Sequence, residues 1–119
     1  MSNVWCVRAD FGTYTQHFVK GGYVAIGWMP TADLSQITTR DEIYPIYKVE
    51  HAEDASNIVI GQQVGQIARF LLEMKTGDYV ITPAADTERL HYGRLAPDPS
   101  YLFAPGDDGC PYRHRRCVE

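Results

Sequence analysis

The triplet at residues 73–75, Glu-Met-Lys, has the E-x-K pattern of metal-dependent nucleases. In those nucleases the motif lies on a strand with an acidic partner beside it. Here the triplet falls in the last turn of an expected helix. The sequence contains no G-x-S-x-G turn, phosphate-binding loop or dinucleotide fingerprint. Cys6 lies in an apolar segment, where a thiol is ordinarily inert packing. These patterns predict that the chain is not itself an enzyme.

Three residues near the end of the chain are of metal-ligating types. Cys110, His114 and Cys117 are spaced C-x3-H-x2-C, and Cys6 or His91 would complete four zinc ligands. Paired C-x-x-C knuckles do not occur in the sequence, so we expect no metal site and no cofactor. Three cysteines at uneven spacing form no disulfide framework and indicate reduced thiols in a reducing compartment.

Aromatic residues carry a more informative pattern. The chain has eight Tyr, four Phe and two Trp. A polar-rimmed pocket walled by such rings can stack a nucleobase. The competing interpretation is that these rings are ordinary core and surface aromatics. The rings that stand where expected strands end are Phe11, Tyr14, Trp28, Tyr92 and Tyr101.

Residues 113–116 read Arg-His-Arg-Arg. If they form a strand, Arg113 and Arg115 share one face and point together toward a phosphate backbone, while His114 and Arg116 face elsewhere. The alternative is a solvated edge strand protected by its charge. The chain has eleven basic against fifteen acidic side chains, a net charge of −4, which argues against coating nucleic acid by electrostatics alone. Any nucleic-acid contact must therefore be local.

Helices and strands that would position these residues follow an α+β order. We expect helices at 14–20, 40–49 and 56–75. The second begins at a capping box formed by Thr39 and Glu42. In the third, apolar residues recur at three- and four-residue steps. This pattern predicts a long helix with one face in the core.

Strands account for the other regular segments. A single sheet containing them must curl around the long helix, and Gly27 and Gly93 lie where it could bend. The length of 119 residues and the hydrophobic content of 45% predict one domain with one core. The expected strands cover residues 4–9, 23–28, 79–82, 90–95, 101–103 and 112–118.

No stretch approaches the roughly 20 apolar residues of a membrane span. The N-terminus lacks a basic region followed by an apolar run, so nothing marks secretion. We therefore expect a cytoplasmic protein without membrane contact.

Several segments together resemble the N-terminal domain found ahead of Mrr-type restriction endonuclease domains. Residues 61–78 also resemble EVE domains, in the spacing of Gln66, Met74 and the Gly77-Asp78 pair. The resemblance implies a PUA/EVE/YTH-like fold, in which a strongly curved sheet forms a pseudo-barrel with flanking helices. It also implies binding of a modified base in an aromatic cage. The segments that carry the resemblance are 4–9, 24–28, 66–74, 77–83 and 112–118.

Individual roles follow from this resemblance. Trp28 matches a cage Trp of YTH-like readers, and Arg8 falls where these families place polar groups of the pocket. The EVE cage Trp and a nearby Asn are replaced by Val59 and Val64. A second ring must therefore come from Phe11, Tyr14 or Tyr92.

The sequence thus predicts one domain over residues 1–119 that recognises a flipped, methylated or hydroxymethylated base in DNA. We expect it to be the N-terminal sensor module of a restriction or antiphage protein, with an effector such as a nuclease beyond its C-terminus. Two alternatives stay open: an RNA-binding module of the same fold, and a protein-interaction domain without a nucleic-acid ligand. The phosphate backbone is expected to contact Arg94, Arg113 and Arg115. The base-binding residues are expected to be Arg8, Asp10, Phe11, Tyr14, Trp28, Thr82 and Tyr92.

Overall fold

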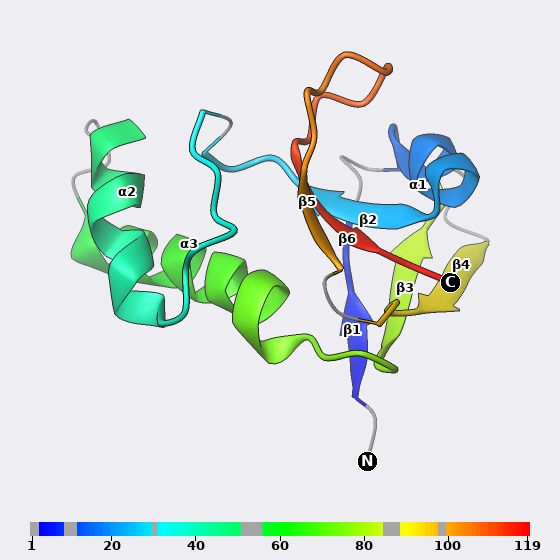
Figure 1. Cartoon of the computed structure of the whole chain (residues 1–119), viewed down its shortest axis with the longest axis horizontal. Coiled ribbons are helices and arrows are strands. Elements are labelled where there is room, and N and C mark those ends of the chain that lie inside the picture. The colour runs from blue at the N-terminus through cyan, green and yellow to red at the C-terminus, as the bar shows by residue number, and fades with distance from the viewer. Residues whose placement is uncertain (1–2, 9–11, 30, 51–55, 85–88, 98–99) are drawn as a thin grey trace.

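The protein has the α+β architecture expected from its sequence. The computed structural model describes residues 3–8, 12–29, 31–50, 56–84, 89–97 and 100–119. Two three-stranded sheets and the short helix α1 occupy one side of the molecule, and helices α2 and α3 occupy the other (Figure 1). The candidate functional residues lie where these two parts meet.

The first sheet has the strand order β1-β3-β4. Strand β1 (Val4–Cys6) runs parallel to β3 (Tyr79–Pro83), which pairs antiparallel with β4 (Leu90–Arg94). Strands β3 and β4 form a hairpin. Parallel neighbours need a long connection, and here the chain between β1 and β3 contains α1, β2, α2 and α3.

The second sheet has the order β2-β6-β5 and is antiparallel throughout. Its strands are β2 (Tyr23–Ile26), β5 (Tyr101–Phe103) and β6 (His114–Cys117). All four residues of β2 are buried. Strand β6 is central, so the alternative that residues 113–116 form a charged edge strand is wrong.

The expectation of a single curled sheet is also wrong for the described residues. A lone bridge from Leu95 to Val118 links the two sheets, and they do not close into a barrel. Gly93 lies at this junction. A Cβ on this residue would come within 2.4 Å of the Val118 side chain, so a larger residue would not fit here. The close approach of the two sheets therefore depends on the missing side chain.

Short helices precede the long one. Helix α1 (Thr15–Gly21) ends at Gly22, whose φ of 70° is the left-handed conformation that glycine adopts readily. The capping box is confirmed, since Thr39 and Glu42 exchange hydrogen bonds around the 3₁₀ turn η1 (Arg40–Glu42). Helix α2 (Ile43–Glu50) follows directly.

The long helix is confirmed but changes character near its end. Helix α3 (Asn57–Ala68) continues into a π-helical turn, η2 (Arg69–Glu73). Its expected apolar face is buried in the core, with Val64 and Ile67 fully enclosed. Phe70 and Met74 extend this face to the end of the π turn. No helix in the described residues is long and apolar enough to cross a membrane.

Candidate functional site

A cavity of about 730 Å³ lies between β1, the end of β2 and the α3–η2 helix. Its floor is apolar and its walls are aromatic. Its rim carries polar and cationic side chains. The lining residues are Trp5, Cys6, Val7, Arg8, Ile26, Gly27, Trp28, Gln66, Arg69, Phe70, Met74 and Tyr112.

Trp5 forms one wall and is held by a buried carboxylate. Its indole Nε1–H donates to Asp78 Oδ2 at 2.9 Å, and the Asp78 carboxylate also accepts from the backbone N–H groups of Asn3 and Lys75. These donors, the Lys75 backbone first and Trp5 second, lower the pKa of Asp78. The Trp5 ring is therefore fixed at the turn that connects η2 to β3.

Tyr112 forms a second wall and packs on a glycine. A Cβ on Gly27 would lie 2.7 Å from the Tyr112 ring, so the ring rests directly against the backbone of β2's end. Tyr14 supports Tyr112 from behind, edge to face, with ring centroids 5.0 Å apart. Gly27 thus serves this close approach, and Tyr14 buttresses a wall of the cavity.

Trp28 forms a third wall, and the residue after it is anchored by a histidine. Met29 has a φ of 51°, which is unusual for a side chain other than glycine. His114 Nε2 lies 2.7 Å from Met29 O, and His114 Nδ1 lies 2.7 Å from the Tyr101 hydroxyl. Because Met29 O can only accept, Nε2 carries the hydrogen, and Nδ1 of a neutral ring accepts from Tyr101. This network holds the turn that carries Trp28.

Lowering the pH should weaken this anchor. Burial lowers the pKa of His114, so below its ordinary value of about 6.5 the unfolded chain takes up a proton that the folded chain does not. The free energy of unfolding should therefore fall between pH 7 and pH 5.5, by at most about 1.4 kcal/mol per pH unit. Chemical denaturation across this range measures it. The fall should disappear in His114→Gln and persist in His91→Gln, and a fall that persists in His114→Gln would contradict the assignment.

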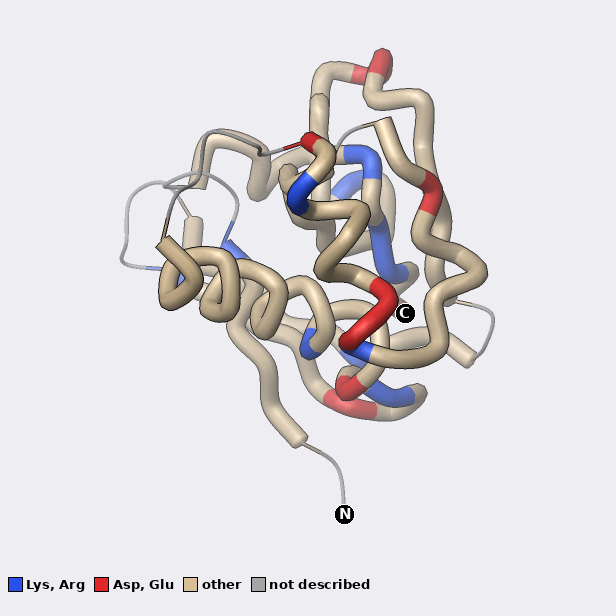
Figure 2. The backbone as a smooth tube through the Cα atoms, turned by 90° about the vertical axis from the view of Figure 1, so that its left-hand side faces the viewer, with Lys and Arg blue, Asp and Glu red and all other residues tan. Residues whose placement is uncertain are grey.

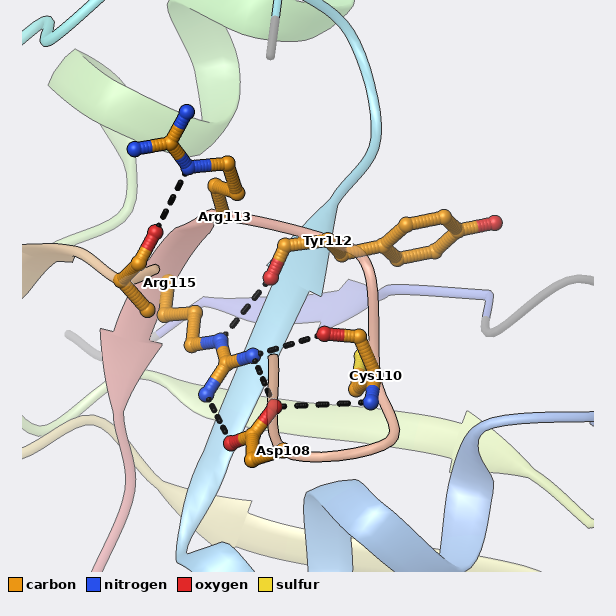
Figure 3. A network of polar contacts seen from close by, with 6 residues as sticks. Asp108, Cys110, Tyr112, Arg113 and Arg115 are labelled. Atoms are coloured by element: carbon orange, nitrogen blue, oxygen red, sulfur yellow. Dashed lines mark hydrogen bonds and ion pairs between the residues drawn. The ribbon is translucent and has the colours of Figure 1, made fainter. Parts of the chain in front are cut away.

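Arg115 clamps the loop that carries Tyr112 (Figure 3). Its guanidinium forms a two-pronged ion pair with Asp108, at 2.7 and 2.9 Å, and also donates to the backbone oxygens of Cys110 and Tyr112. The carbon of the same guanidinium lies 4.3 Å from the ring centroid of Tyr23. The hydrogen bonds from Arg115 hold the pKa of Asp108 well below its usual range. Arg115 is 5% exposed, so the expectation that it faces a phosphate backbone is wrong.

Asp108→Asn should loosen this clamp. The ion pair is half open to solvent on the Asp108 side, so we expect a loss of about 1 kcal/mol in the free energy of unfolding at pH 7. Because the folded pKa of Asp108 is depressed, its contribution is present above about pH 4 and is lost as the pH falls further. Denaturant titrations at pH 7 and pH 3 measure the difference. Asp107→Asn, at the exposed neighbouring position, is the matched control; equal losses in both variants would exclude the clamp.

Arg116 anchors the cavity floor. It donates to Ser100 Oγ at 2.7 Å and to the backbone oxygens of Phe70, Leu71 and Met74 at 2.6, 3.3 and 2.9 Å. These carbonyls belong to the end of the π turn, where the helix itself supplies no donors. Three successive residues of β6 therefore fix three parts of one cavity: the Trp28 turn, the Tyr112 loop and the floor.

Cationic groups at the rim are free to meet a ligand. Arg8 and Arg69 are exposed, and neither guanidinium has a hydrogen-bond or ion-pair partner within the part of the chain that the structure describes. The described lining residues include no Asp, Glu or His. Basic and acidic positions are interspersed along the rest of the backbone in the view of Figure 2. The local positive charge at this rim is thus a feature of the cavity.

The structure places the other expected base-binding residues elsewhere. Thr82 and Tyr92 line a separate cavity of about 320 Å³ between α1 and the two sheets. The Thr82 hydroxyl is buried and has no hydrogen-bond partner among the described residues, and Tyr92 is 81% exposed. Asp10 and Phe11 lie outside the described residues. Of the expected base-binding residues, Arg8 and Trp28 line the larger cavity.

Expected backbone contacts are also placed apart from this cavity. Arg94 Nε donates to Gly77 O, and the Arg94 guanidinium lies over the Tyr79 ring. Arg113 donates to Ala104 O and stacks over Phe103. Neither lines the 730 Å³ cavity. Their role in nucleic-acid contact stays a prediction.

Trp5 and Tyr112 are walls that the sequence reasoning missed. Trp5 is in the first expected strand, and its partner Asp78 is in the Gly-Asp pair of the EVE-like segment. The sequence predicts Tyr112 at the start of the last strand, but it belongs to the loop before β6. Neither contact is readable from spacing, because each joins residues more than 70 positions apart or a loop to a distant glycine.

The suggested zinc ligands do not come together. Within the described ranges, no three His, Cys, Asp or Glu side chains are grouped to hold a metal ion. Cys110 is buried under the Arg115 clamp, and both nitrogens of His114 are already hydrogen bonded. The E-x-K triplet lies at the end of η2, where Lys75 Nζ donates to Leu72 O.

Residues 6–119 match the family described as a domain of unknown function, DUF8426. The chain belongs to this family. The match begins at Cys6, the last residue of β1, and runs to the last residue. Among the described elements it includes β2 to β6 and the helices α1, α2 and α3, and it leaves out Val4 and Trp5 of β1. Comparisons with curated proteins and with solved structures gave no match.

Proposed function

We propose that this DUF8426 domain recognises a methylated or hydroxymethylated base that is flipped out of DNA, and that it does so in the 730 Å³ cavity. The observation that carries the proposal is the combination of three aromatic walls, from Trp5, Trp28 and Tyr112, with a cationic rim. A cavity of this volume is in the range of small-molecule sites. Stacking on such rings stabilises a base by about 1–3 kcal/mol per stack.

An apolar floor favours a base that carries a methyl group. Phe70 and Met74 are each 3% exposed and face this cavity together with Val7 and Ile26. Burying one methyl group there contributes about 0.8 kcal/mol. This is a factor of about four in affinity, so discrimination also needs the shape of the floor that Arg116 sets.

The proposed role of the cavity is binding, and any catalytic activity would belong to an attached domain. The described lining residues include no His, Asp or Glu, the types most often used in general acid–base catalysis, although Cys6 and Tyr112 are present. A reader of this kind would act as the sensor module of a restriction or antiphage protein, and the cutting activity would belong to a separate effector such as a nuclease. The PUA-like fold that the resemblance implies is part of this proposal, and the bridge between Leu95 and Val118, which joins the two sheets at one point, is the contact that supports it.

The test is a binding titration against four DNA duplexes at fixed, moderate salt. They share one sequence and differ in one central base: unmodified cytosine, 5-methylcytosine, 5-hydroxymethylcytosine, or N6-methyladenine in place of a neighbouring adenine. Fixed salt is essential because phosphate contacts alone give affinity. A preference of tenfold or more for one modified duplex is expected. Equal binding to all four would refute the proposal, and so would tighter binding to an RNA duplex of the same sequence, titrated beside them as a fifth ligand.

A further inference from the structure

A second groove, of about 460 Å³, runs along the exposed side of α3. Residues 57, 61, 65 and 69 form one row at four-residue steps, and such residues lie one above the other on a helix. The row spans about 18 Å at 1.5 Å per residue. The lining residues are Arg40, Asn57, Ile58, Gly61, Gln62, Gly65, Gln66 and Arg69.

Arg40 is held flat against this helix. Its Nη2 donates to Gly61 O at 3.1 Å and lies 3.5 Å from the Tyr44 hydroxyl. A Cβ on Gly65 would lie 3.4 Å from Nη2, so the guanidinium covers the glycine. Arg40 lies within the capping box, directly after Thr39, and the box fixes the turn that carries it. Its Nε and Nη1 have no acceptor among the described residues and are available to a ligand.

The chemistry of the groove matches a chain of phosphate groups. It contains two arginines and three side-chain amides, and the described lining residues include no carboxylate. The chain as a whole has a net charge of −4, so the groove is positively charged in a protein that is acidic overall. Guanidinium and amide N–H groups are common ligands of phosphate oxygens in protein–DNA complexes.

The groove is continuous with the aromatic cavity. Gln66 and Arg69 line both. A strand whose base enters the cavity would place the phosphates beside that base at Arg69, and the next phosphates along α3 toward Arg40. This joins the two binding features through shared residues.

We propose that the α3 groove binds the phosphodiester backbone of the strand that carries the flipped base, with Arg40 and Arg69 as its phosphate ligands. This inference rests on the proposed function for the identity of the strand. It assigns the backbone contact to α3 and η1, in place of the strand residues expected from the sequence. Positive charge supplied by these two side chains, of which Arg40 is held by Gly61 O, also explains how an acidic domain meets DNA locally.

The test uses two duplexes, one with the preferred modified base and one with a tetrahydrofuran abasic site at the same position. Arg40→Gln should weaken binding to both by the same factor, about tenfold at 0.1 M salt, because it removes a phosphate contact and leaves the base site intact. The slope of log Kd against log salt concentration should fall by about one. Arg69→Gln should also weaken binding to both duplexes, but Arg69 lines the base cavity as well as the groove, so equal factors are expected of Arg40→Gln alone. Trp28→Ala should weaken binding only to the base-containing duplex.

Lys20→Gln is the charge-matched control, since Lys20 is exposed on α1 at the other side of the molecule (Figure 1). Selective binding of the modified base that is equally strong in the Arg40 and Arg69 variants would overturn the groove and leave the proposed function standing. Loss of affinity in these variants without any preference for a modified base would support the groove and overturn the proposed function. Absence of binding by the unaltered domain to both duplexes would overturn both.

Discussion

Replacement of Arg116 by methionine is expected to lower the free energy of unfolding by about 3–5 kcal/mol. Arg116 is 4% exposed, and its guanidinium satisfies three helix-end carbonyls and the Ser100 hydroxyl. Methionine fills similar volume but offers no donor, so these acceptors would be buried without partners. Urea denaturation followed by tryptophan fluorescence measures the loss.

Arg94→Met is the matched control, because Arg94 is exposed and its hydrogen bond to Gly77 O is long, at 3.4 Å. It should cost no more than about 1 kcal/mol. Arg116→Lys should fall between the two, since an ammonium group keeps the charge but cannot reach several carbonyls at once. If Arg116→Met is no less stable than Arg94→Met, β6 is not the anchor of the cavity floor.

Trp28→Ala is expected to remove the preference for a modified base. Loss of one stacking wall should raise Kd for the preferred duplex by about 10- to 100-fold, which corresponds to about 1–3 kcal/mol. Because Trp28 is only partly buried, the accompanying loss of stability should be smaller than the 3–5 kcal/mol typical of removing a core Trp. The titration proposed above and a thermal melt measure the two effects.

Tyr92→Ala distinguishes the two cavities. The sequence placed Tyr92 with the base-binding residues, whereas the structure places it in the 320 Å³ cavity on the other side of the sheets. It should leave base preference unchanged. If Tyr92→Ala abolishes the preference and Trp28→Ala does not, the base site is the 320 Å³ cavity. Its polar group would then be the Thr82 hydroxyl, which is buried without a hydrogen-bond partner among the described residues.

β6 connects the stability of the domain with the shape of its cavity. His114, Arg115 and Arg116 are all buried in a central strand, where polar side chains are rare without partners. Each is fully engaged with backbone or side-chain groups of a different wall. The hydrogen bonds of these three residues therefore stabilise the fold and also hold the walls and floor of the cavity in place.

Local patterns in the sequence determined much of the fold. The i, i+3 and i+4 spacing of apolar residues predicts the long helix, the Thr39–Glu42 box predicts η1, and short β-rich runs predict the six strands of the described residues. These features depend on contacts between near neighbours, so periodicity and capping residues predict them directly. The α+β class follows from their order. Trp28 and Arg8 were singled out on a resemblance, and both line the larger cavity.

Only the tertiary structure decided how the strands divide into two sheets and what the basic segment does. The sequence predicts that side chains along β6 alternate between the two faces of the sheet. The partners that they meet on each face belong to a turn, a loop and a helix end, of which the turn and the helix end are distant in sequence. A run of arginines is the same sequence whether it meets phosphate, a carboxylate or helix carbonyls. Burial decides between these, because a buried guanidinium requires fixed acceptors. Burial depends on how the folded chain packs, so the burial of Arg115 and Arg116 could not be predicted from the sequence pattern alone.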